Sequence, residues 1–163
     1  MKTNDLSHYR YRGARALVIM HDQHLREFYE TWKQAKAVKV VLPQTEDPDY
    51  QSLEHVLHHA LRAARGYMTW MCEQLGLPDP QIQPAPPPER AQAEADQYLE
   101  YVLEKWREPL AAVPEERFEE AFPSRWKTVY CIDAMLEHAV VHPMRHTFQL
   151  RELLAVQKIE NKK

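Results

Sequence analysis

The chain has 163 residues, of which 44% are hydrophobic and 28% are charged, and these values predict a single globular domain spanning residues 1–163. The formal net charge is −3 with both signs interspersed, so the basic surface that nucleic acids or anionic membranes require is absent. Three glycines are too few for glycine-rich phosphate loops or hairpin-rich folds, and twelve prolines favour helices joined by stiff connections.

The sequence contains no apolar segment that predicts export or membrane insertion. Its longest uninterrupted apolar run, residues 16–20, is five residues long, and the first six residues lack the apolar core of a signal peptide. The two cysteines, Cys72 and Cys131, match no C-x-x-C pattern, so a disulfide framework is not expected. We therefore expect a cytoplasmic protein.

Apolar residues that recur every three or four positions predict the first helix over residues 12–36. They are Ala14, Val18, His21, Leu25, Phe28, Trp32 and Ala35. Asp47 and Pro48 then form a helix start signal, because aspartate caps helix N-termini and proline fits the first turn. The second helix is predicted over residues 49–75, and Gly76 ends it.

Six prolines between residues 78 and 88 predict a stiff extended crossover, and a third helix is expected over residues 89–107. Residues 108–130 read as irregular, with 126–131 extended. The last helix is predicted over residues 133–157, before a polar tail at 158–163. Four helices with two long connections predict an all-α four-helix bundle.

The histidines are the most informative residues. Six of the nine fall into two clusters, which are His55, His58 and His59, and His138, His142 and His146. In the last helix, His142 and His146 lie one turn apart on the apolar face, and in the second helix His59 borders the core. Three imidazoles from two helices can bind one metal ion and leave a position open, as in catalytic zinc sites. Nickel, copper and iron also accept such ligands, so the sequence alone does not fix the ion.

Other arrangements of the histidines stay open at this point. Buried histidines can simply be core residues, and His21 lies centrally in the apolar face of the first helix. His55 would replace His59 if the second helix were rotated, and His55, His21 or His138 could complete the metal site. Pro143 lies between the two histidines of the last helix and is predicted either to kink the helix or to restart it.

Residues 135–150 resemble the final helix of the DinB/YfiT-like superfamily, whose signature there is H-x-x-x-H-R-G-Q. His142, His146 and Gln149 match the signature, while residues 147 and 148 replace its arginine and glycine. Members of this superfamily are four-helix bundles of the same kind. One histidine of their second helix and the H-x-x-x-H pair of their fourth hold a metal.

In the second helix, the resemblance assigns the third ligand to His59, because the family's histidine precedes an aromatic pair that Tyr67 and Trp70 match here. The resemblance thus implies one divalent ion, zinc or nickel first and iron as a further possibility, at His59, His142 and His146. It also implies a homodimer.

Relatives in this superfamily are described as metal-dependent hydrolases and as bacillithiol- or mycothiol-dependent transferases or isomerases. The resemblance therefore implies an enzyme with a small-molecule substrate, including a low-molecular-weight thiol. No buried pair of carboxylates is expected, so the ion would activate a water molecule or bind a thiolate. The predicted substrate pocket consists of Tyr67, Trp70, Tyr98 and Gln149. The alternative is a non-catalytic stress or scaffold bundle that the ion only stabilises.

Overall fold

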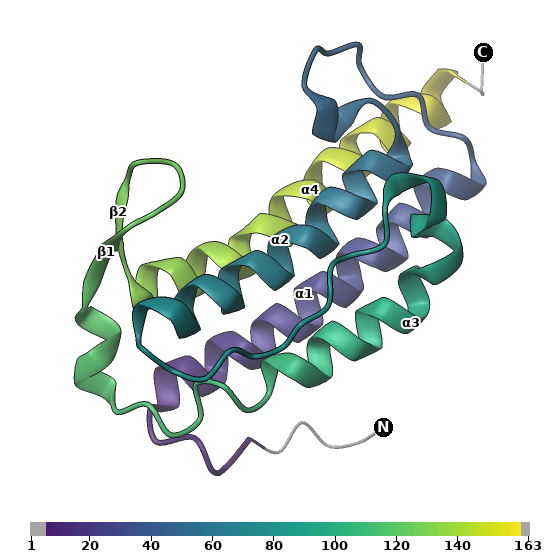
Figure 1. The fold of residues 1–163 in the computed structure, drawn as a ribbon. Coiled ribbons are helices and arrows are strands. Elements are labelled where there is room, and N and C mark those ends of the chain that lie inside the picture. The colour runs from purple at the N-terminus through teal and green to yellow at the C-terminus, as the bar shows by residue number, and fades with distance from the viewer. Residues whose placement is uncertain (1–5, 161–163) are drawn as a thin grey trace.

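The computed structural model describes residues 6–160, and four helices in it pack as a bundle (Figure 1). They are α1 (Arg12–Ala37), α2 (Leu53–Gln74), α3 (Pro88–Trp106) and α4 (Ile132–Glu160). The predicted all-α four-helix bundle is confirmed. The predicted absence of a signal peptide concerns the N-terminus, which lies outside the described residues. The end of the predicted polar tail also lies outside them. None of the helices within residues 6–160 has the length and apolarity needed to cross a membrane.

The start of α2 differs from the prediction. Asp47 was predicted to cap this helix, but the structure has two separate N-caps in this segment. The Asp47 carboxylate accepts a hydrogen bond from the Asp49 amide and begins only a short 3-10 turn, η1 (Pro48–Tyr50). Ser52 then caps α2 by accepting from the amide of His55. Asp49 and Tyr50 consequently lie on a separate turn beside the helix.

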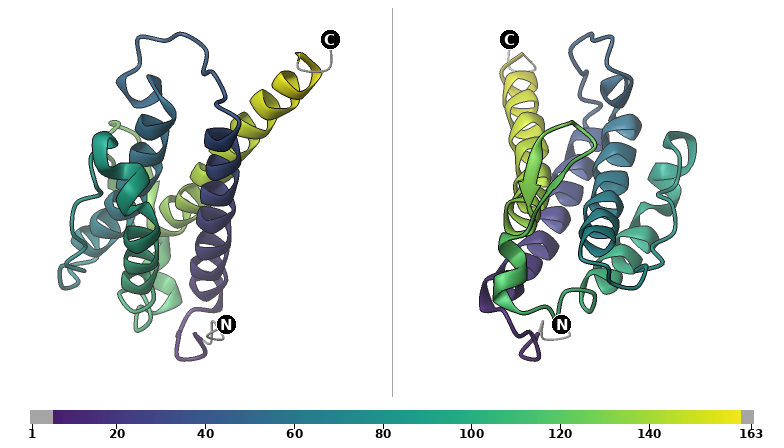
Figure 2. Two further views of the ribbon diagram at one scale, coloured as in Figure 1. Left: turned by 90° about the vertical axis from the view of Figure 1, so that its right-hand side faces the viewer. Right: turned by 60° about the vertical axis from the view of Figure 1, so that its left-hand side comes forward.

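The proline-rich crossover runs back along α2 and sets the direction of α3. His58 Nδ1 donates to the carbonyl of Pro86 at 2.8 Å, and Arg65 Nε donates to the carbonyl of Ile82 at 2.7 Å. The chain therefore returns to the level at which α2 began, and α3 runs in the same direction as α2 (Figure 2). The other two helices, α1 and α4, run in the opposite direction and pack against each other along much of their lengths.

A short hairpin precedes α4 within the segment predicted to be irregular. It pairs β1 (Ala121–Pro123) with β2 (Val129–Cys131) in antiparallel fashion, and the 3-10 turn η2 (Glu115–Glu119) leads into it. The predicted extended segment at 126–131 thus forms a strand only over its last three residues. The hairpin stands beside the first turns of α4 (Figure 1).

Pro143 lies inside α4, and the helix continues through it. Of the two predicted alternatives, a kink or a restart, the continuous helix excludes the restart. The Thr147 hydroxyl donates to the carbonyl of Pro143 at 2.9 Å and supports the backbone at this turn. One uninterrupted helix consequently carries both His142 and His146.

His21 is a core residue on α1. Its side chain is 1% exposed, its ring stacks on Trp106 with centroids 3.6 Å apart, and its Nδ1 has no hydrogen-bond partner among residues 6–160. Burial is the main cause that lowers the pKa of His21 to about 3. The imidazole is therefore neutral in the folded protein across the whole range in which a free histidine titrates.

Acid should destabilise the fold partly through His21. Between its folded pKa of about 3 and an unfolded value of about 6.5, the unfolded chain binds more protons, so stability falls as the pH drops through this window. The contribution is about 2 kcal/mol at a pH of about 5. When the pH falls from about 7.5 to about 5, we expect the free energy of unfolding of His21→Leu to decrease by about 2 kcal/mol less than that of the wild type. Urea unfolding measures this, and equal losses in both proteins would contradict it.

Candidate metal centre

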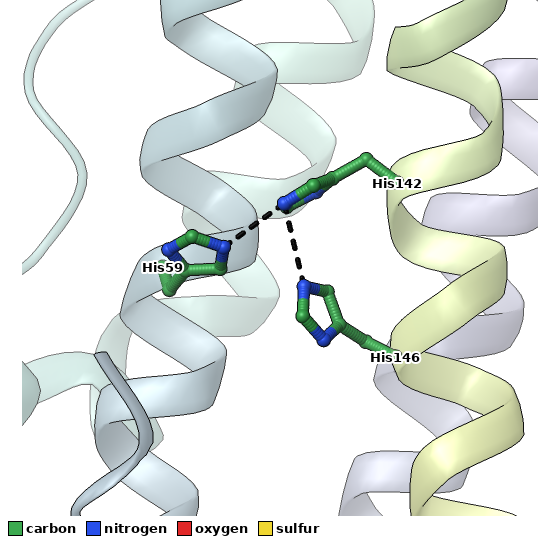
Figure 3. Close-up of side chains that lie close together, drawn as sticks. All are labelled: His59, His142 and His146. Atoms are coloured by element: carbon green, nitrogen blue, oxygen red, sulfur yellow. Dashed lines mark hydrogen bonds between the residues drawn. The ribbon is translucent and has the colours of Figure 1, made fainter. Parts of the chain in front are cut away.

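The structure brings together the three histidines predicted as metal ligands (Figure 3). His59 projects from α2, and His142 and His146 project from successive turns of α4. Their Nε2 atoms converge, with 2.9 Å between His59 and His142 and 3.3 Å between His146 and His142. Two nitrogens that bind one tetrahedral zinc ion at about 2.1 Å lie about 3.4 Å apart. All three ligand atoms lie within 4.8 Å of one another, so the cluster approaches the dimensions of a three-imidazole metal site.

Two neighbouring side chains fix how the outer imidazoles are oriented. Asp49 Oδ2 lies 2.8 Å from Nδ1 of His59, and Gln149 Oε1 lies 3.0 Å from Nδ1 of His146. Both oxygens can only accept, so each Nδ1 carries the proton and each Nε2 presents a lone pair to the centre of the cluster. Outer partners of this kind are characteristic of histidines that bind metals.

The protons of the cluster cannot satisfy all three nitrogens. His59 and His146 both direct a lone pair at Nε2 of His142, which carries at most one hydrogen. One of the two contacts is therefore left without a proton to share, in a place where two of the histidines are buried. A cation at the centre would accept all three lone pairs.

The surroundings keep the three imidazoles neutral. Burial lowers the pKa of His59, His142 and His146, and the neighbouring imidazoles lower the pKa of His142 further. The neutral imidazole is the form that binds a metal ion. The site therefore offers its lone pairs at neutral pH without first losing protons.

Two cavities adjoin the cluster from different sides. The larger, which we call the aromatic cavity, has a volume of about 600 Å³ and reaches His59 and His142, and Tyr67 and Trp70 line it. The smaller, of about 410 Å³, reaches His146 and includes Gln149. Tyr98 lines neither of them.

Three of the four predicted pocket residues thus border the candidate site, although Gln149 also holds His146 in place. Tyr98 instead belongs to the contact between α3 and the crossover, because its hydroxyl donates to the carbonyl of Gln83 at 2.8 Å. A role of these residues in binding a substrate stays a prediction.

The alternative ligands lie elsewhere in the described part of the chain. His55 faces the N-terminus of α2, where its Nδ1 lies 2.9 Å from the Ser52 hydroxyl. His21 stacks on Trp106 in the core. His138 lines the aromatic cavity and contributes no nitrogen to the three-histidine group.

Sequence reasoning missed two residues of the site, Asp49 and Tyr50. The Tyr50 ring lies over the cluster, with its centroid 5.7 Å from those of both His59 and His146. Neither residue belongs to a periodic pattern, since both lie on the isolated turn η1. The one usable signal was chemical: a metal-binding histidine needs an outer acceptor, and Asp49 is the acidic residue of the turn that precedes α2.

Comparison with known proteins adds no relative. No model of a protein family matches the sequence, no curated protein is significantly similar to it, and no solved structure is significantly similar to the fold. The resemblance to the DinB/YfiT-like superfamily therefore rests on the helix order and the three histidines, and family membership stays a hypothesis.

Asp49→Asn should weaken metal binding without removing a ligand. The change takes away the negative charge that orients His59 and raises the basicity of its Nε2, and such outer-partner changes cost about 10–100-fold in metal affinity. Zinc competition titration against a chromophoric chelator measures the effect. Glu46→Gln is the matched control, because it removes one exposed charge from the same loop, and it should leave the affinity unchanged. An equal loss in both variants would contradict the assigned role of Asp49.

Proposed function

We propose that this protein is a metal-dependent enzyme of the DinB/YfiT-like kind, which binds one divalent ion at His59, His142 and His146. The reaction class is hydrolysis or transfer involving a low-molecular-weight thiol. The resemblance favours zinc or nickel, with iron as a further candidate, and the cysteine pattern favours the cytoplasm as the compartment. The observation that carries the proposal is the convergence of three Nε2 atoms that hydrogen bonds alone cannot satisfy.

The aromatic cavity favours the enzyme over a purely structural role for the ion. A structural zinc site usually has four protein ligands, whereas this cluster has three and adjoins a cavity of about 600 Å³. A ligand in that cavity would lie against His59 and His142. The non-catalytic alternative has support of its own, because an ion at the cluster would tie α2 to α4.

Each residue of the site has a definable task. The ion, when bound, supplies Lewis acidity that favours the deprotonated form of a water or a thiol. Asp49 and Gln149 hold the imidazoles of His59 and His146 in the tautomer that keeps Nε2 free. Tyr50 packs against the rings of His59 and His146 and lines the smaller cavity beside His146.

Metal content is the first test of this proposal. Untagged protein that has never met a chelating column should contain about one zinc, nickel or iron per chain by plasma mass spectrometry. The His142→Ala/His146→Ala double variant, prepared in parallel, should contain none. Absence of metal from the wild type, even after reconstitution with each ion, would remove the basis for the enzyme and leave the histidines as core residues.

The open coordination position decides between the enzyme and the structural alternative. Cobalt(II) can replace zinc and report its ligands through visible absorption. Added 2-mercaptoethanol or azide should change the spectrum of the cobalt-loaded protein if a position is exchangeable. An unchanged spectrum with both additives would favour the scaffold reading. The homodimer that the resemblance implies stays a prediction, to be tested by light scattering.

A further inference from the structure

The aromatic cavity beside the three histidines is positively charged, although the chain as a whole has a net charge of −3. Three arginines line the cavity, and they come from different elements: Arg62 from α2, Arg125 from the turn of the hairpin and Arg145 from α4. Asp49 is the one acidic residue among the lining residues. The cavity therefore carries more positive than negative charge before any metal ion is added.

Only one of these arginines has its charge matched. Arg62 Nη2 donates to both carboxylate oxygens of Asp49, at 3.0 and 2.9 Å. Within residues 6–160, the guanidinium groups of Arg125 and Arg145 are exposed and form no hydrogen bond or ion pair with a protein group. Two guanidinium groups consequently border the cavity with their donors available to a ligand.

Aromatic side chains form an apolar wall in the same cavity. Trp126 and Tyr130 of the hairpin and Tyr67 of α2 surround the ring of His138, with centroids 5.4–5.7 Å from it. Trp126 is 56% exposed, which is unusual for the largest apolar side chain unless a ligand or partner covers it. These rings are inclined to that of His138 by 41–76°, so the wall offers both ring faces and ring edges, the two contacts that an aromatic ligand prefers.

We propose that the substrate of this site is an organic carboxylate with a planar apolar body, whose carboxylate binds Arg125 and Arg145 while its body lies on the wall of Tyr67, Trp126 and Tyr130. This inference specifies the substrate class and rests on the proposed function for the role of the cavity as a substrate site. The volume of about 600 Å³ accommodates a molecule of two fused rings with room for a second reactant. A divalent ion at the three histidines would add to the attraction for such an anion.

The test uses 2-naphthoate as the probe, with its neutral analogue 2-naphthamide for comparison. Calorimetric titration is done on metal-free and on zinc-loaded protein, and metal content is measured on the same samples. Arg125→Gln/Arg145→Gln removes the two unpaired charges. Arg12→Gln/Arg90→Gln is the matched control, because it changes the net charge equally at two exposed arginines that do not line the cavity.

We expect naphthoate to bind the metal-free wild type at least about 10-fold more tightly than naphthamide, as charged hydrogen bonds require. The Arg125/Arg145 double variant should lose this difference and still bind naphthamide, which also shows that it folds. The control variant should bind both probes as the wild type does. Equal binding of the two probes, equal losses in both double variants, or binding that needs zinc and ignores the arginines would overturn the proposal.

These outcomes separate the two proposals. If the wild type takes up no metal even after reconstitution but still binds naphthoate through the arginines, the anion site stands and the proposed metalloenzyme is overturned. A protein that holds one ion but does not distinguish naphthoate from naphthamide would keep the metal site and overturn the substrate class.

Discussion

Replacing His142 with leucine is expected to abolish stoichiometric metal binding while leaving the metal-free protein as stable as the wild type. His142 is the central member of the cluster, since its Nε2 lies within 3.3 Å of both other ligand atoms. Its loss should weaken zinc binding more than the 10–100-fold expected for an outer partner, so we expect more than about 100-fold. Competition titration and urea unfolding of the metal-free protein measure the two effects.

The stability of the metal-free variant separates a metal site from a histidine core. If the imidazoles serve only as packed, hydrogen-bonded core residues, His142→Leu should cost about 1–3 kcal/mol through lost hydrogen bonds. If they are arranged for an ion, leucine replaces a poorly satisfied polar group and the metal-free fold loses nothing. His138→Leu and His55→Leu are the controls, because each lies one turn before a proposed ligand. Metal affinity that falls equally in the controls would contradict the assignment.

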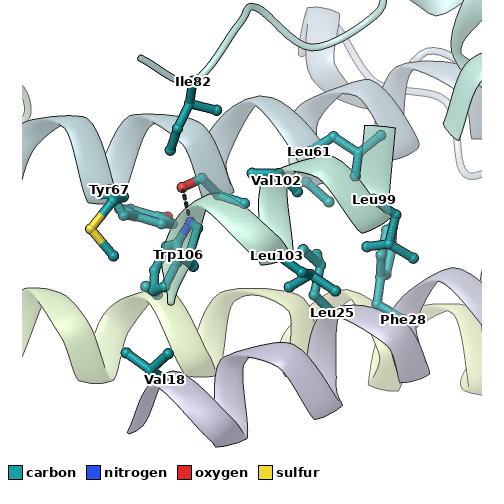
Figure 4. Packing of buried hydrophobic residues seen from close by; sticks show 14 of the residues in the cluster. Val18, Leu25, Phe28, Leu61, Tyr67, Ile82, Leu99, Val102, Leu103 and Trp106 are labelled. Carbon is teal, nitrogen blue, oxygen red and sulfur yellow. Dashed lines mark hydrogen bonds between the residues drawn. The ribbon is translucent and has the colours of Figure 1, made fainter. Parts of the chain in front are cut away.

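Replacing Trp106 with alanine should produce the largest loss of stability, about 3–5 kcal/mol. The side chain is 1% exposed at the end of α3, where it stacks on His21 of α1. Its Nε1 donates to the carbonyl of Ala64 on α2 at 3.0 Å, the dashed line in Figure 4. The indole thus joins three helices, and alanine would leave a cavity and remove this hydrogen bond between α3 and α2.

Two further tryptophan variants divide this effect into its parts. Trp106→Phe keeps an aromatic ring against His21 but removes the donor, so we expect about 1–3 kcal/mol of destabilisation. Trp126→Ala removes the same side chain from an exposed position and should change stability by no more than about 0.5 kcal/mol. Guanidinium unfolding followed by circular dichroism compares the three. A Trp106→Ala protein that unfolds with the wild type would contradict the packing described.

The helices and the histidine cluster were accessible from sequence because both follow from helical periodicity. The phase of α4 places His142 and His146 on one face, and the phase of α2 selects His59 over His58. No tertiary information is needed for either step. The pairing of α2 with α4 came from the resemblance, and the structure places those helices side by side.

The residues outside the periodic segments could not be predicted in this way. Asp49 acts on His59 from a separate turn, and its place depends on where Ser52 begins α2. Arg125 and Trp126 reach the aromatic cavity from a hairpin with strands of only three residues each, too short for a recognisable alternation. Tyr98 was predicted to line the substrate pocket because it lies on the inward face of α3. That face meets the crossover at Tyr98, whose hydroxyl donates to the carbonyl of Gln83.

The separation of the ligands along the chain determines when the centre can form. His59 and His142 are 83 residues apart, so the nascent polypeptide leaves the ribosome with an isolated histidine until its final helix emerges. Acquisition of the proposed metal ion would therefore follow synthesis of α4. Because the ion would bind the folded chain and not the unfolded one, it would raise the free energy of unfolding by about 2.7 kcal/mol at a free ion concentration of about 100 times the Kd. Loading would thus add stability to a fold that the metal-free polypeptide has already reached.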